Sequence, residues 1–204
     1  MVIKCIPTGM FGSNSYIVGD NKEAVVIDAG VSAEEIIKAA EAEGLKLKYV
    51  LLTHGHIDHI ASIDRLRSAS GIQALIHEQD ADAVTNPVLN GSALFGTAKT
   101  FNPADRLLKG GELVEAGGIG FEIIHTPGHS PGCICIKAGN NIFTGDTLFK
   151  LSIGRTDLGK GNYEDIIASI TQKLSALDDS TVVYPGHGSS TTIGYEKKNN
   201  PFIR

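Results

Sequence analysis

The sequence predicts an α/β fold with layered helices and sheets, and two features support this prediction. Short apolar runs bounded by turn residues alternate with segments whose apolar residues repeat at the helical spacing. The 204-residue chain has 42% hydrophobic and 20% charged residues, which is typical of a globular protein with one well-buried core. We therefore expect a single domain over residues 1–204.

Seven apolar runs are predicted to be strands, because each is short and ends at turn residues. Cys133 and Cys135 alternate along one of them, so we expect both thiols to pack in the interior. With Cys5 they are too few for a disulfide framework. The predicted strands are Ala24 to Ile27, Tyr49 to Leu52, Ala74 to Ile76, Phe121 to Ile124, Cys133 to Ile136, Ile142 to Thr144 and Thr181 to Tyr184.

Three helices are predicted between these strands. The first opens with the capping box Ser32-x-x-Glu35, the second starts near His59 and ends before Gly71, and the third is capped by Asn162. Each has an apolar stripe at helical spacing, which predicts one buried face. The stripes are Ala33, Ile36, Ile37 and Ala40, then Ile60, Ile63 and Leu66, then Ile166, Ile167, Ile170 and Leu174.

Charge and hydropathy argue against several classes of partner. The net charge is −5, no long basic run occurs and aromatic residues make up 6%, so nucleic acid is not an expected partner. No apolar stretch approaches the roughly 20 residues that cross a bilayer, so no membrane partner is expected. The segment from Met1 to Pro7 is too short for a secretory signal, and we expect a cytoplasmic protein. Nothing in the sequence predicts an oligomeric state.

The segment from Thr53 to His59 is the most informative part of the chain. It directly follows a predicted strand and combines imidazoles with a carboxylate, the side chains that hold metal ions in proteins. Gly55 favours a tight turn that lets alternating side chains converge, whereas we expect a helix here to spread them apart. The predicted ligands of this segment are His54, His56, Asp58 and His59.

Three further candidates each follow the end of a predicted strand. His129 comes after Thr126-Pro127-Gly128, Asp146 comes after Gly145, and His187 comes after Pro185-Gly186. Loops at the carboxyl ends of strands can meet at one edge of a sheet, even when they are far apart in sequence. We therefore expect these side chains to join the first cluster.

Together these motifs resemble the metallo-β-lactamase superfamily over nearly the whole chain. The resemblance implies a four-layer αβ/βα sandwich with two central sheets and helices outside. It implies that His54, His56 and His129 hold one metal ion and that Asp58, His59 and His187 hold a second, with Asp146 between them. The run from Gly154 to Asp157 and the ending Asn200-Pro201-Phe202 further resemble short bacterial proteins similar to glyoxalase II, the hydroxyacyl-glutathione hydrolases.

Two divalent ions are the expected cofactors, zinc first, with iron or manganese as alternatives. A hydroxide held between the metals is the expected nucleophile, because metal binding lowers the pKa of water from about 15.7 to near 7. Asp58 is expected to be a ligand that also orients this hydroxide. The expected substrate is a small molecule, a thioester of glutathione or of another thiol, because a thiol with a pKa of about 8.5 leaves without a strong general acid.

Other residues receive weaker assignments. Asp28 is expected to hydrogen-bond a ligand histidine, with a turn-forming role as the alternative. His77 and His125 are expected to be structural. Arg155 either meets an anionic substrate or pairs with Asp157, and the internal pair is favoured. The Asn86 to Asn102 segment is either a substrate-side loop or a surface loop that packs its own apolar residues.

Two functions from other classes remain alternatives. Persulfide dioxygenases share this fold and the Gly-Arg-Thr-Asp motif, and the resemblance implies that they use positions matching His54, His129 and Asp146 for a single iron. A non-catalytic scaffold is the other alternative, although every ligand position here is filled. Larger glyoxalase II enzymes carry a C-terminal helical region for glutathione, and little chain follows His187, so the thiol carrier stays open. Secreted β-lactamases match poorly because no export signal is expected.

Overall fold

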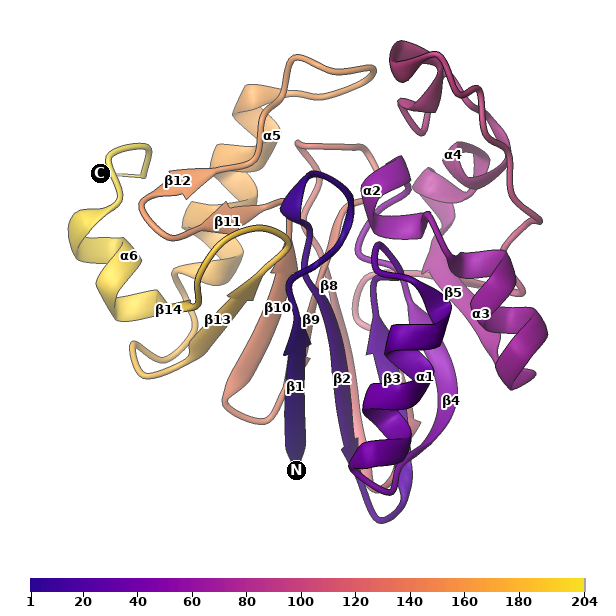
Figure 1. Ribbon diagram of the computed structural model, residues 1–204. Coiled ribbons are helices and arrows are strands. Elements are labelled where there is room, and N and C mark those ends of the chain that lie inside the picture. Colours follow the sequence, from indigo (N-terminus) through magenta and orange to yellow (C-terminus); the bar gives the residue numbers. More distant parts are fainter. Residues whose placement is uncertain (204) are drawn as a thin grey trace.

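The computed structural model describes residues 1–203 and contains two six-stranded sheets (Figure 1). The single domain predicted for residues 1–204 includes Arg204, which lies outside the described residues. The first sheet has the order β1-β2-β3-β4-β5-β6 and is parallel from β3 to β6. Its strands are β1 Val2–Ile6, β2 Ser15–Asp20, β3 Glu23–Ile27, β4 Lys46–Leu51, β5 Gln73–His77 and β6 Arg106–Leu108.

The second sheet has the order β14-β13-β10-β9-β8-β7, and only β10 and β13 are parallel neighbours in it. A small hairpin of β11 and β12 follows β10 in the chain. The strands are β7 Leu113–Ala116, β8 Ile119–His125, β9 Ile134–Ala138, β10 Asn141–Gly145, β11 Leu148–Phe149, β12 Ser152–Ile153, β13 Val182–Pro185 and β14 Thr191–Thr192.

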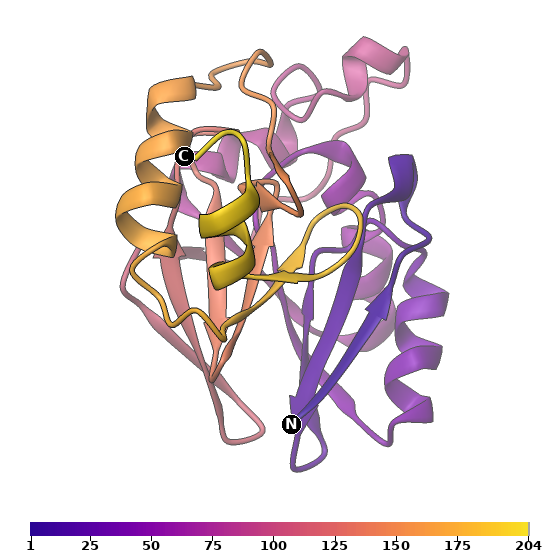
Figure 2. The same cartoon turned by 90° about the vertical axis from the view of Figure 1, so that its left-hand side faces the viewer.

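Helices cover the outer faces of both sheets, and Figure 2 shows the resulting order of layers, with α1 outside one sheet and α5 outside the other. On the first sheet lie α1 Ala33–Ala42 and α3 Ile63–Ser70, with the short α2 Ile57–Ile60 and α4 Ala81–Thr85 toward one end. On the second lie α5 Tyr163–Ala168, the π-helical turn η4 Ser169–Leu174 and α6 Ile193–Asn199. Three 3₁₀ turns complete the elements, η1 Met10–Gly12, η2 Glu78–Asp80 and η3 Ser92–Phe95.

Three hydrophobic cores separate these four layers. Successive residues of a strand point to opposite faces, so a strand buried on both faces contributes to two cores. In β2, Ile17 packs toward the helices of the first sheet, whereas Val18 packs between the sheets. In β10, Phe143 packs between the sheets and Ile142 toward α5 and α6. This alternation holds the sheets face to face, as the predicted αβ/βα sandwich requires.

The first helix begins and ends as its sequence predicts. The Ser32 hydroxyl accepts a hydrogen bond from the Glu35 backbone N–H at 3.3 Å, which satisfies a donor that the first turn leaves free. Ile36 and Ala40 are buried against the sheet. Gly44 follows the last turn with a φ of +67°, a backbone conformation that glycine adopts without a steric penalty. Asn162 caps α5 in the same way, as expected.

The second predicted helix differs from its expectation in two ways. It was expected to start near His59 and begins at Ile57, so Asp58 and His59 both lie in its first turn. It is also interrupted, because Ser62 leaves the helical conformation between α2 and α3. Neighbouring helical positions point about 100° apart. This divergence lets Asp58 face the opening of the site while His59 is fully buried.

The seven predicted strands all occur, with bounds shifted by a few residues, and Cys133 falls just before β9. Seven further strands were not predicted, namely β1, β2, β6, β7, β11, β12 and β14. The parallel pairing of β10 with β13 sets Gly145 opposite Pro185, so the loops that follow these strands leave the sheet side by side. No helix among residues 1–203 is both long and apolar enough to span a membrane.

Candidate metal centre

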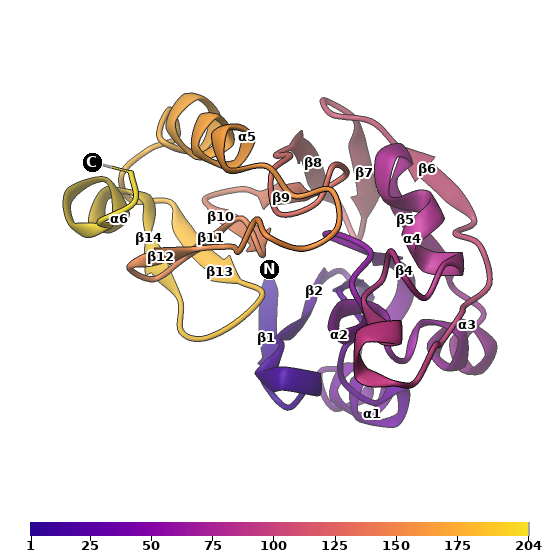
Figure 3. The same ribbon diagram turned by 90° about the horizontal axis from the view of Figure 1, so that it is seen from above.

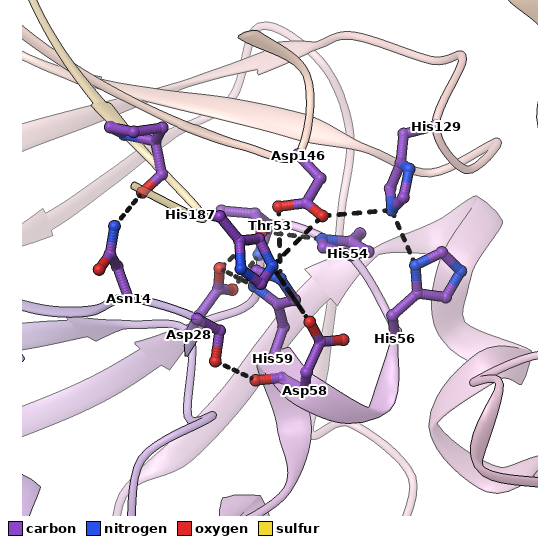
Figure 4. A network of polar contacts seen from close by, with 12 residues as sticks. Asn14, Asp28, Thr53, His54, His56, Asp58, His59, His129, Asp146 and His187 are labelled. Atoms are coloured by element: carbon purple, nitrogen blue, oxygen red, sulfur yellow. Dashed lines mark hydrogen bonds and ion pairs between the residues drawn. The ribbon is translucent and has the colours of Figure 1, made fainter. Parts of the chain in front are cut away.

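All seven predicted ligand residues lie together at one end of the sandwich, where loops of both sheets meet (Figure 4). The first sheet supplies the segment after β4, which continues into α2. The second sheet supplies the loops after β8, β10 and β13. Their ligand atoms form three overlapping groups, each within 4.8 Å: His54, His56 and His129; His54, His59 and Asp146; and Asp58, His59 and His187.

We call His54, His56 and His129 the first half of the centre. The closest ring atoms are His56 Nδ1 and His129 Nε2, which are 2.8 Å apart. The His54 ring is buried, with its centroid 4.8 Å from each of the other two rings. His129 Nδ1 donates a hydrogen bond to the Arg155 carbonyl at 2.8 Å. This bond fixes the ring and leaves Nε2 as the free nitrogen that faces the cluster.

Asp58, His59 and His187 form the second half. His187 Nε2 lies 3.1 Å from Asp58 Oδ2 and 3.3 Å from His59 Nε2. His59 is fully buried, while the side chain of His187 is 27% exposed. The open side of the centre therefore lies next to His187.

Asp146 lies between the two halves. One carboxylate oxygen is 3.4 Å from His59 Nε2, and the other is 3.6 Å from both His129 Nε2 and His187 Nε2. Gly186 makes this approach possible, because a Cβ there would collide with the Asp146 carboxylate and lie 2.8 Å from the His59 ring. The carboxylate can thus serve a cation in either half.

The unpaired atoms of the cluster fit a metal site. Within residues 1–203, two buried side-chain atoms have no hydrogen-bond partner, His54 Nε2 and Asp146 Oδ1, and both belong to the cluster. A buried polar atom without a partner costs about 1–3 kcal/mol, so such atoms in a folded protein call for a binding partner. Imidazole nitrogens with carboxylate oxygens are a donor set that suits zinc, iron and manganese.

The two halves differ in their protonation. Burial, with neighbouring imidazoles, holds the pKa of His54 well below its usual value, and burial next to His129 lowers the pKa of His56 to about 3. Burial acts in the same direction on His59 and His187, but it is outweighed by carboxylates. The Asp146 and Asp28 charges raise the pKa of His59 well above its usual value, and the hydrogen bond to Asp58 raises that of His187.

Asp28 supports the second half, as the sequence led us to expect. Its Oδ2 accepts a hydrogen bond from His59 Nδ1 at 2.8 Å and one from the Thr53 hydroxyl at 2.7 Å, while Oδ1 accepts from the Thr53 backbone N–H. The carboxylate fixes the His59 ring so that Nε2 faces the cluster. It also ties this ring to the start of the loop that carries His54.

Asp80 supports the first half, and the sequence analysis missed it. This buried carboxylate accepts hydrogen bonds from the Gly55 backbone N–H at 3.0 Å, the Ser130 hydroxyl at 2.6 Å and the Gly132 backbone N–H at 2.7 Å. It therefore joins the turn between His54 and His56 to the loop after His129. A signal was present, because Asp80 follows the end of a strand just as the ligands do.

The N-terminal strand pair holds the loop of His187. The Asn14 side chain donates to the carbonyls of Pro185 and Gly188 at 2.9 and 3.0 Å, and the Tyr16 hydroxyl donates to Pro185 at 2.6 Å. Figure 4 shows Asn14 reaching toward this loop from the first sheet. No sequence motif pointed to these contacts.

The residues with weaker assignments lie outside the cluster. His77 and His125 stack on each other with ring centroids 4.1 Å apart, and neither belongs to a group of ligand atoms. Arg155 pairs with Asp157 through two contacts of 2.6 and 2.8 Å, which is the internal pair that was favoured. Cys133 and Cys135 are buried, and burial raises the pKa of both thiols.

A cleft of about 540 Å³ opens over the ligands. It is bordered by η1, by the η3 part of the 86–102 segment and by the β11–β12 hairpin, which stand at this end of the molecule (Figure 3). Leu94 and Phe95 line the cleft from that segment, whereas Phe101 packs against the core of the first sheet. The segment therefore lines the cleft and also packs part of its own apolar surface, while its contact with a substrate stays a prediction.

Comparison with known proteins identifies the family. The sequence model of the metallo-beta-lactamase superfamily matches residues 8–187, and the chain belongs to this superfamily. A hydroxyacylglutathione hydrolase, GloC of Haemophilus influenzae, is 40% identical over the whole of this chain and 98% of its own length. The resemblance predicted from the motifs is therefore confirmed.

Solved structures confirm the fold. The B3 metallo-beta-lactamase BLEG-1 superposes with a TM-score of 0.94 at 40% identity, over 99% of each chain. TTHA1623, in a di-iron-bound form, gives 0.87 at 32% identity, over 98% of this chain and 99% of that one. ETHE1 from Myxococcus xanthus gives 0.82 at 29% identity, over 98% of this chain and 84% of its own. These relatives include proteins with different names for their activity, so the fold alone does not define the substrate.

Proposed function

We propose that this protein is a metal-dependent thioester hydrolase with a two-metal centre. The observation that supports it best is the pair of ligand groups, each with three donors, that share access to Asp146. A centre with one ion would leave the second group without a function. The similarity to a hydroxyacylglutathione hydrolase over the full length supports the thioester as the bond that is cleaved. We propose zinc as the metal, with iron and manganese as alternatives.

The metals would activate a water molecule and polarise the thioester carbonyl. The protein side chains hold these groups in place. Asp28 fixes the tautomer of His59, and the Arg155 carbonyl does the same for His129, so that each Nε2 faces inward. Asp58 lies at the open side, bonded to His187, where its carboxylate can accept a hydrogen bond from the attacking water. The thiolate leaves without a general acid, since its conjugate thiol has a pKa of about 8.5.

Two further assignments belong to this proposal. We place the enzyme in the cytoplasm, where a reducing environment keeps the thiol product free. We also regard residues 1–204 as one folding unit that acts on a small molecule. The net negative charge and the absence of long basic runs in the sequence do not favour nucleic acid as a binding partner.

Thiol release from acyl thioesters tests the proposal, beginning with lactoyl-glutathione because of the named relative. Zinc-loaded protein should release free thiol, measured with a thiol-reactive dye, and an oxygen electrode should record no uptake. The rate should fall on the acid side with an inflection on the order of pH 6 to 7, as the activated water becomes protonated. A zinc-loaded protein that cleaves no thioester of any acyl group would refute the assignment.

The second candidate is an iron-dependent persulfide dioxygenase. The likeness to ETHE1 and the Gly-Arg-Thr-Asp motif favour it. It needs only His54, His129 and Asp146, so it gives no metal-binding role to His56, Asp58 or His187. Activity confined to iron-loaded protein, with one oxygen consumed per glutathione persulfide and no thioester cleavage, would establish this alternative and exclude the hydrolase.

A further inference from the structure

The cleft over the metal centre has predominantly apolar walls. Five of the predicted ligands form its floor, and seven hydrophobic side chains surround them. These come from four separate parts of the chain, so the apolar character does not belong to one loop. The hydrophobic lining residues are Phe11, Ile57, Leu94, Phe95, Phe149, Ile153 and Leu158.

The remaining polar lining residues are engaged elsewhere. Asn90 is buried and bonds the Lys99 carbonyl and the Ser92 backbone N–H. The hydroxyl of Ser152 lies 3.5 Å from the Ile153 carbonyl, a long and weak hydrogen bond. Arg155 is the one permanently charged cation among the described residues that line the cleft, and its Nε and Nη2 donate to Asp157 at 2.6 and 2.8 Å. The cleft thus offers a substrate few partners for carboxylates or hydroxyls beyond the metals.

Phe11 adds an exposed aromatic ring to the apolar wall of the cleft. Its φ is +54°, a strained value for a bulky residue that persists where the surrounding structure imposes it. The neighbouring Ser13 forms a β-bridge with His187, which fixes the turn beside the open side of the centre. The centroids of the Phe11 and Phe95 rings lie 4.8 Å apart with the ring planes tilted by 43°, and these residues are 59% and 56% exposed. The two rings contact each other and are still about half exposed, so they form an apolar wall that a ligand can contact.

We propose that this cleft selects thioesters whose acyl group is apolar, an alkyl or aryl chain rather than a hydroxyacyl group. This inference rests on the proposed thioester hydrolysis and names the substrate class for it. The carbonyl would lie at the metals and the acyl chain along the wall formed by Phe11, Leu94 and Phe95. Glutathione carries carboxylates and an ammonium group that the free side chains of the cleft do not match, so the selection acts on the acyl half.

Acyl chain length on one constant thiol carrier tests this selection. Acetyl, butanoyl, hexanoyl and lactoyl thioesters of N-acetylcysteamine differ only in the acyl group. Each buried methylene should raise kcat/KM by about fourfold until the cleft is filled, and the hexanoyl ester should exceed the lactoyl ester at least tenfold. A lactoyl ester that is cleaved as fast as or faster than the hexanoyl ester would overturn the inference and leave the hydrolase assignment intact.

Matched phenylalanine variants locate the selection in the wall. Phe95→Ala should lower kcat/KM for the hexanoyl ester by roughly fivefold or more and change the lactoyl rate by less than about twofold. Phe202 is 44% exposed and does not line the cleft, so Phe202→Ala is the control and should leave both rates unchanged. An equal loss on both esters in Phe95→Ala, or no loss on either, would contradict the proposed role of the wall.

A binding measurement separates this inference from the proposed function. S-heptyl-N-acetylcysteamine is a thioether that cannot be hydrolysed, and calorimetry of the zinc-loaded protein should detect its binding, weakened about fivefold or more by Phe95→Ala. If no thioester is cleaved but this probe still binds with that dependence, the hydrolase proposal fails and the apolar cleft stands. If the probe does not bind, or Phe95→Ala binds it equally well, the apolar selection fails.

Discussion

The two halves of the candidate metal centre contain three donors each but are stabilised differently. In the first half, burial and neighbouring imidazoles lower the pKa values of His54 and His56, so these rings are neutral at physiological pH. In the second half, carboxylates raise the pKa values of His59 and His187, so these rings take up protons at a higher pH than the rings of the first half.

This difference predicts an order of metal binding. An ion entering the first half meets free imidazole nitrogens and has no proton to displace from His54 or His56. An ion entering the second half competes with protons that the raised pKa values of His59 and His187 favour, so its affinity depends on pH. Asp146 reaches both halves and couples them.

Removing Asp146 should have the largest effect, because it abolishes the contact between the halves. Asp146→Ala should lose more activity than the roughly 10- to 100-fold typical of residues that only support a ligand, and should retain less than two zinc ions per chain. Metal content and kcat/KM measure this. His77→Ala is the matched control, since His77 lies outside the cluster and should keep its metal. An equal loss of zinc and of kcat/KM in both variants would contradict the role of Asp146 as the residue shared by the two halves.

Asp28 and Asp80, which hydrogen-bond the second and the first half respectively, should each affect metal binding at only one half. Asp28→Asn removes the acceptor for His59 and should weaken zinc at the second half by about 10- to 100-fold. Asp80→Asn disturbs the bonds to Gly55 and Ser130 and should weaken the first half by about 10-fold or more. Calorimetric titration resolves the two sites. If both variants weakened the same site, the division into halves would be wrong.

Acidification should release the second-half ion first. The pKa values of His59 and His187 are raised, so protons compete there already above the ordinary histidine value of 6.5, and affinity falls as the pH drops through this region. The pKa of His56 is lowered to about 3, so the ion in the first half should stay bound to a lower pH than the ion in the second half. Zinc titrations between about pH 8 and 5.5 check this, and simultaneous loss of both ions would count against it.

The smallest effect is expected for the Arg155 side chain. Its backbone carbonyl fixes His129, but its guanidinium forms an exposed pair with Asp157, and exposed pairs contribute little to stability. Arg155→Ala should therefore keep the metal content and the Tm of the parent protein, as thermal unfolding with bound zinc can show. A loss of zinc from this variant would mean that the side chain itself supports the first half.

The sequence predicted the layered fold and the gathering of all seven candidates, because both depend on short-range patterns. Strand ends followed by His or Asp are visible in the chain, and parallel strands bring such ends to one edge. The Ser32 and Asn162 caps are likewise local and were predicted. The role of each candidate as a ligand stays a prediction.

What the sequence did not predict depends on contacts between distant segments. Asn14 and Tyr16 hold the His187 loop from more than 160 positions away, and Asp80 joins two loops across the sheets. The second helix was expected to start near His59, whereas α2 begins at Ile57 and so includes Asp58, because the ligand spacing suggested a simple turn up to that point. The exposed aromatic pair of Phe11 and Phe95 comes from two loops with no shared motif.

Native mass spectrometry of the zinc-titrated chain can show whether the two halves form one centre with two ions. We expect a species with two zinc ions per chain near pH 7.5, which converts to a species with one ion as the pH is lowered through the range where His59 and His187 take up protons. A chain that never binds more than one zinc ion, at any pH and with zinc in excess, would contradict it.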